Sequence, residues 1–126
     1  MRSNFHMLAN YVIYQFTTFV AMNARIKNII QVLEHWAPPA LQESYDNSGL
    51  ICGDPNDACT GVLVCLDSTE AVVDEAISKG HNLVVAHHPI LFSGIKKLTG
   101  RTYAERAIIK AIRHNVSIYA LHTNLD

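Results

Sequence analysis

The sequence is poor in cysteine and has no excess of charge of either sign. Its 126 residues include three cysteines, Cys52, Cys59 and Cys65. Their odd number and their spacing fit neither a disulfide framework nor the paired CxxC motifs of a structural zinc site. This pattern argues against a disulfide-stabilised secreted domain, and we expect a protein of the reducing cytoplasm.

The near balance of charges also restricts the partners. Ten Lys and Arg oppose eleven Asp and Glu, which gives a formal net charge of −1. Without a surplus of basic residues the chain has no bulk field with which to hold a nucleic-acid backbone. We therefore do not expect a nucleic-acid partner.

The sequence also lacks an apolar run of the roughly 20 residues that a membrane-spanning helix needs. Its most apolar stretch, residues 5–22, is interrupted by His6, Asn10, Gln15, Thr17 and Thr18. A signal peptide is one alternative, but the stretch has only Arg2 before it and no clean cleavage site. We favour residues 1–21 as a non-native, disordered or helical N-terminal extension, with Met22 as the native start, and we expect no membrane partner.

Residues 22–126 form a chain long enough for one globular core, since 49% of the whole sequence is hydrophobic. Apolar residues at helical spacing predict three helices, and short apolar runs between turn residues predict strands. The predicted helices lie around residues 26–33, 72–77 and 104–112; the predicted strands are residues 50–52, 61–66, 82–86 and 116–121. Asp67 and Glu70 fit a capping signal for the second helix, which Gly80 ends, and Asn115 ends the third.

This alternation predicts an α/β fold. Residues 61–86 form one βαβ unit, whose two strands must run parallel because a helix connects them. We expect a three-layer-like arrangement in which helices pack on a parallel or mixed sheet.

Polar residues follow the last two predicted strands. His87 and His88 come after the first of them, and His122 and Asp126 after the second. In an open parallel sheet the ligand site lies beyond the carboxyl ends of the strands, so these side chains should meet there. Successive side chains point in different directions, so the His-His pair suits two neighbouring metals, with Asp126 completing or bridging the site. The alternative is that these histidines only form hydrogen bonds within a loop.

Met22 to Asp126 also resembles the amino-terminal portion of the Ngg-interacting-factor-three-like family, the GTP cyclohydrolase I type 2 homologues. The matching segments are IKNIIQVLEHWAPPALQESYDNSGLICGDP, GVLVCLD, NLVVAHHPILF, IKKLTG and IYALHTNLD. The resemblance implies that His87, His88 and Asp126 are ligands of a dinuclear metal site, with His122 as a further ligand or a partner of one. Asp46 and Asn47 lie in a motif of the family to which sequence chemistry assigns no role.

The chain departs from this family in one respect. Family members are about twice as long or longer, and a later His and Glu, four residues apart, complete their metal pair. The sequence ends at Asp126 and contains no such pair. We therefore expect an incomplete half of the family fold and weak metal binding, because both metals would lack ligands. Mixed imidazole and carboxylate ligands suit Zn, Fe, Mn or Ni.

Two functions remain in view. The first is a metal-dependent hydrolase that acts on a nucleotide, GTP by the resemblance, and that truncation impairs; no catalytic or substrate-binding residue is assigned. The alternative is a non-catalytic metal-binding regulatory or scaffold protein. The resemblance also implies a homohexamer for the full-length protein.

The loop of residues 94–102 (GIKKLTGRT) is not a phosphate-binding P-loop. Five residues instead of four separate its glycines, and Arg101 stands where Lys belongs. Lys96, Lys97 and Arg101 are either a solvated cluster or contacts for a phosphate group.

Overall fold

The computed structural model describes residues 23–125. The proposed N-terminal extension, residues 1–21, lies outside the described residues. In chain order the elements are helix α2 (Ile26–Trp36), the 3₁₀ turn η1 (Pro39–Leu41), strands β1 (Gly49–Cys52) and β2 (Val62–Asp67), helix α3 (Glu70–Ser78), strand β3 (Leu83–His88), helix α4 (Tyr103–Arg113) and strand β4 (Ser117–Ala120).

The four strands form one mixed sheet in the order β1-β4-β3-β2. β2, β3 and β4 are parallel, and β1 pairs antiparallel with β4 at the edge. The parallel βαβ unit predicted for residues 61–86 is confirmed as β2, α3 and β3. The α/β prediction with a mixed sheet is therefore correct.

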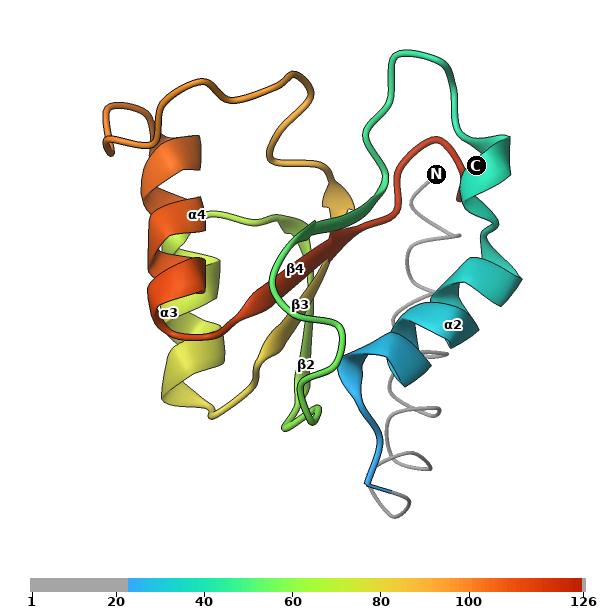
Figure 1. Ribbon diagram of the computed structural model, residues 1–126, viewed down its shortest axis with the longest axis horizontal. Helices are drawn as coiled ribbons and strands as arrows, with labels where there is room; N and C mark the ends of the chain where they lie inside the picture. The colour runs from blue at the N-terminus through green and yellow to red at the C-terminus, as the bar shows by residue number, and fades with distance from the viewer. Residues whose placement is uncertain (1–22, 126) are drawn as a thin grey trace.

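Helices cover both faces of the sheet (Figure 1). α2 packs on one face through Ile26, Ile29 and Leu33, and α3 and α4 pack side by side on the other. Along β3 the side chains alternate between the two cores: Leu83 and Val85 belong to the α2 core and Val84 to the α3–α4 core. The predicted three-layer arrangement is confirmed, and the central strands β3 and β4 are buried on both faces.

The start of α3 differs from the prediction. Asp67 does not cap this helix, because it is the last residue of β2 and pairs with His88 of β3. Thr69 is the N-cap instead, and its hydroxyl accepts a hydrogen bond from the Val72 N–H. Thr also caps well, and the shift frees the Asp67 carboxylate for the end of the sheet. The predicted helix end is confirmed, since Gly80 follows with φ of +69°.

No helix between residues 23 and 125 is long and apolar enough to cross a membrane.

The first turn of α4 is closed by a reciprocal capping box. The Thr102 hydroxyl accepts from the Glu105 N–H, and the Glu105 carboxylate accepts from the Thr102 N–H. The Thr99 N–H donates to the same carboxylate. These two backbone hydrogen bonds, Thr102 first, lower the pKa of Glu105. The capping box thus joins the exposed loop before α4 to the helix.

The first prediction concerns this cap. Thr102→Ala removes the acceptor for the Glu105 N–H and should lower the free energy of unfolding by about 1 kcal/mol. Urea unfolding followed by circular dichroism measures the loss. Thr99→Ala is the matched control, because the Thr99 hydroxyl takes no part in the box, and it should change the free energy by less than about 0.5 kcal/mol.

The second prediction concerns pH. The folded-state pKa of Glu105 is lowered, so its contribution to stability is present above the unfolded pKa of about 4.3 and is lost as pH falls through the folded value. Glu105→Gln should therefore be less stable than the wild type at pH 7, and the difference should shrink below about pH 4. A difference that stays constant between pH 7 and pH 3 would contradict the lowered pKa.

Candidate metal centre

Three imidazoles meet at the carboxyl ends of β3 and β4. His87 and His88 are the last two residues of β3, and His122 follows β4 after one intervening residue. The strands are neighbours in parallel register, with Ala86 opposite Ala120. One ligand nitrogen from each of the three histidines lies within 4.8 Å of the other two. The strand-end convergence predicted for these histidines is confirmed.

The three rings form a nearly even triangle. The ring centroids are 4.9 Å apart for His87 and His88, 5.3 Å for His87 and His122, and 5.6 Å for His88 and His122. All three pairs are tilted or edge-to-face, and none is stacked in parallel. His87 is the inner member, with 1% of its surface exposed, while His88 and His122 are half-buried. The cluster therefore has a closed side at His87 and a more open side at the other two rings.

Among the described residues, a carboxylate partner can be given for two of the histidines, His88 and His122. Nδ1 of His88 lies 2.8 Å from Oδ1 of Asp67, and Nδ1 of His122 lies 3.2 Å from Oδ1 of Asp46. A carboxylate only accepts hydrogen bonds, so each contact places the proton on Nδ1 and leaves Nε2 as the nitrogen with a lone pair. Metal-binding histidines in proteins usually have this arrangement.

The two carboxylates differ in their surroundings. The Asp46 side chain is fully enclosed, and that of Asp67 is 63% exposed. Enclosure works to raise the pKa of Asp46, but the hydrogen bonds that its carboxylate accepts, foremost from Thr123, outweigh this and lower the pKa to about 2. Asp46 is therefore a carboxylate anion at neutral pH.

The structure brings together His87, His88 and His122 of the predicted site. Asp126 lies outside the described residues, so its assignment as a ligand stays a prediction. Sequence reasoning missed the roles of Asp46 and Asp67. The role of Asp67 could have been predicted, because Asp67 ends a predicted strand next to the strand of His88. The role of Asp46 could not, because its position in a turn does not indicate a hydrogen-bond partner 76 residues away.

The cysteines contribute no reactive thiolate. Burial raises the pKa of the Cys65 thiol to about 12 and also raises the pKa of Cys52 and Cys59. All three thiols therefore stay protonated at neutral pH, whereas both a metal ligand and a nucleophile require the thiolate.

Comparison with known proteins identifies similar chains. The family model described as Duf34/NIF3 (NGG1p interacting factor 3) matches residues 24–126. A protein of Clostridium acetobutylicum named GTP cyclohydrolase 1 type 2 homolog is 41% identical over 105 residues, which are 83% of this chain and 39% of that protein. A protein of the same name from Staphylococcus aureus (strain COL) is 43% identical over 102 residues, or 81% of this chain and 28% of that protein.

Solved structures show the same fold. A Staphylococcus aureus crystal structure superposes with a TM-score of 0.78 at 42% identity and covers 82% of this chain and 34% of its own. Reduced HcgD from Methanocaldococcus jannaschii gives a TM-score of 0.75 at 30% identity, with coverage of 82% and 41%. The chain thus spans about two fifths or less of the length of these matches.

Proposed function

The chain belongs to the Duf34/NIF3 family, and from this we propose that it supplies the amino-terminal part of a divalent-metal site in a metal-dependent hydrolase. One observation carries the proposal: ligand nitrogens of His87, His88 and His122 lie within 4.8 Å of one another. The cluster offers three imidazole nitrogens to one small space, and imidazole is a ligand that transition metals favour in proteins.

The donor set fits a transition metal. Imidazole suits Zn, Fe and Ni better than it suits Mg or Ca, which prefer oxygen ligands. The carboxylates of Asp67 and Asp46 further fit a metal site, because they orient the rings of His88 and His122 and increase their basicity. In this proposal Asp126 adds a carboxylate ligand, and Mn remains within the proposed range because of that oxygen.

The proposal includes two metal ions. His87 and His88 are consecutive residues of one strand, and their differing exposure fits side chains that leave the strand in different directions. Two ions, each with one of these imidazoles, suit that arrangement better than one ion with both. Further ligands would come from another part of a longer protein or from a second copy of the chain in a homohexamer.

When bound, such ions supply Lewis-acid assistance and an activated water for hydrolysis. The chain's own residues bind and orient: buried His87 closes the inner side of the site, and half-buried His88 and His122 leave the outer side accessible. The names of the relatives suggest a nucleotide, GTP, as the substrate class. The proposed reaction is therefore hydrolysis at an electrophilic carbon of a nucleotide.

The second candidate is a non-catalytic metal-binding regulator or scaffold. It is favoured by the family description, which names an interacting factor. Metal binding is common to both candidates, so it is the first property to test.

The third prediction is that the chain binds Zn²⁺ through the three histidines. His88→Ala and His122→Ala should each weaken binding by at least about tenfold in isothermal titration calorimetry, because each removes one ligand. Both side chains are partly exposed, so these variants should fold. His35→Ala, an exposed histidine on α2, is the matched control and should leave the affinity unchanged. If His88→Ala and His122→Ala bind Zn²⁺ with the same affinity as the wild type and the control, the site is excluded.

The fourth prediction separates the two candidate functions. The longest form that the gene encodes should hydrolyse GTP in the presence of Mn²⁺ or Zn²⁺. Hydrolysis should stop when a chelator removes the metal. Formate and nucleotide products, followed by chromatography, report the turnover. Metal binding by that form without turnover of GTP or related nucleotides would favour the scaffold.

A further inference from the structure

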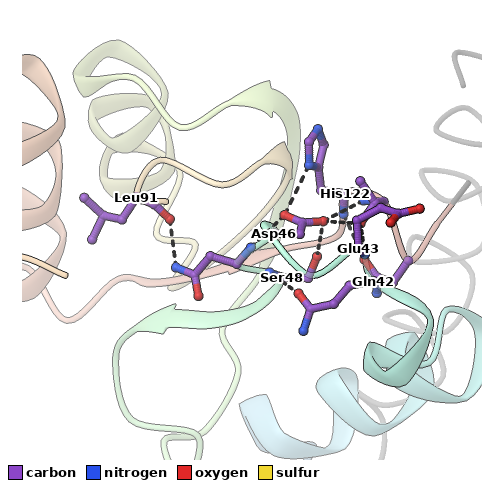
Figure 2. Close-up of polar contacts among 9 residues, drawn as sticks. Gln42, Glu43, Asp46, Ser48, Leu91 and His122 are labelled. Atoms are coloured by element: carbon purple, nitrogen blue, oxygen red, sulfur yellow. Dashed lines mark hydrogen bonds and ion pairs between the residues drawn. The ribbon is translucent and has the colours of Figure 1, made fainter. Parts of the chain in front are cut away.

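The segment of residues 42–48 crosses the end of the sheet and contacts the exits of two strands (Figure 2). Its amide side chain Asn47 donates from Nδ2 to the Leu91 carbonyl, 2.7 Å away, in the loop after β3. Its backbone and side chains contact His122 and Thr123 after β4. The segment thus joins the loop that follows His87 and His88 to the loop that carries His122, although 44 and 76 residues separate the partners in sequence.

Asp46 is at the centre of these contacts. Its Oδ1 accepts from the Asn47 N–H at 2.7 Å and lies 3.2 Å from Nδ1 of His122. Its Oδ2 accepts from the Thr123 N–H at 2.9 Å, from the Thr123 hydroxyl, and from the Ser48 hydroxyl at 3.2 Å. Every hydrogen bond is one that an ionised carboxylate accepts, so both oxygens are held in place.

Thr123 determines which oxygen of Asp46 accepts its hydroxyl proton. The Glu43 N–H donates to the Thr123 hydroxyl at 2.8 Å, so that hydroxyl must direct its own proton elsewhere. It directs it to Oδ2 of Asp46. The chain of donors therefore runs from the segment's backbone through Thr123 to the carboxylate. Oδ1 is then the oxygen that remains for the ring of His122.

Asp46 differs from Asp67 in this respect. The side chains of Asp46 and His122 are 0% and 17% exposed, whereas those of Asp67 and His88 are 63% and 43% exposed. The His88 contact is a single exposed hydrogen bond, which constrains the ring of His88 less than an enclosed network would. The His122 contact belongs to an enclosed network, so the ring of His122 is fixed before any ion arrives.

We propose that Asp46 is a positioning residue that holds His122 as the Nδ1–H tautomer, with Nε2 presented to the histidine cluster. The expected effect on metal affinity rests on the proposed metal site, but the tautomer of His122 can be measured without metal. A fixed tautomer and ring orientation lower the cost of binding, and loss of such a partner typically weakens metal affinity 10- to 100-fold.

The first test uses the metal-free wild-type chain. Histidine ring nitrogens labelled with ¹⁵N report by NMR which ring nitrogen carries the proton, and the spectra are recorded at increasing pH until the ring signals no longer change. We expect the Nδ1–H form at His122. The Nε2–H form, or an equal mixture of the two tautomers, would overturn the proposal. This measurement needs no substitution, so it decides the question even if every Asp46 variant fails to fold.

The second test is Asp46→Asn, which keeps the size of the side chain but replaces one acceptor oxygen with a donor. We expect His122 to lose its single tautomer and Zn²⁺ affinity to fall 10- to 100-fold. The matched control, Asn47→Ala, removes the bond to the Leu91 carbonyl from the same segment but leaves the Asp46 carboxylate intact. Asp74→Asn makes the same charge change on α3, away from the site.

The outcomes separate the possible roles. An effect in Asp46→Asn with near wild-type behaviour in Asn47→Ala and Asp74→Asn supports positioning by the carboxylate. Equal loss of the tautomer in Asn47→Ala would show that only the fold of the segment matters and would overturn the proposal. Unchanged affinity in Asp46→Asn would overturn it as well. If the wild type binds no Zn²⁺, the proposed function fails, while the wild-type tautomer still decides the role of Asp46.

Discussion

The candidate site depends on the parallel pairing of β3 with β4. This pairing places Ala86 opposite Ala120, so the residues that follow these positions lie at the same end of the sheet, where the parallel strands have their carboxyl ends. The register is well specified because β3 alternates between two buried cores, and a shift of one residue would move every side chain to the opposite face. The same packing that stabilises the sheet therefore sets the distance between the histidines.

The two carboxylate partners, Asp67 and Asp46, reach the same end of the sheet in different ways. Asp67 is in register with His88 across β2 and β3, so strand pairing alone brings the two side chains together. Asp46 comes from a segment outside the sheet, which the Asn47–Leu91 and Thr123 contacts hold against it. One partner is thus a product of regular secondary structure, and the other requires long-range contacts.

The sequence predicted most of the fold because its information is local. Helical spacing identified α2, α3 and α4, and apolar runs identified the strands and the strand-end histidines. The prediction failed for Asp67, since a capping motif is short enough to occur by chance at a strand end. It assigned no role to Asp46, because nothing near residue 46 indicates a hydrogen bond to residue 122. Hydrophobic periodicity could not predict the contacts that depend on tertiary structure.

The three histidines also differ in how firmly their surroundings hold each ring. His87 is held by burial at the inner end of the site, and His122 by the enclosed carboxylate of Asp46. His88 has only an exposed hydrogen bond to Asp67, whose net stabilisation in water is small. In the proposed site, the two fixed rings would set where the ions sit, and the less constrained His88 ring would accommodate ions of different radius. Such a division fits imidazole ligands that accept several transition metals, and it locates the rigidity of the site in the contacts of Asp46.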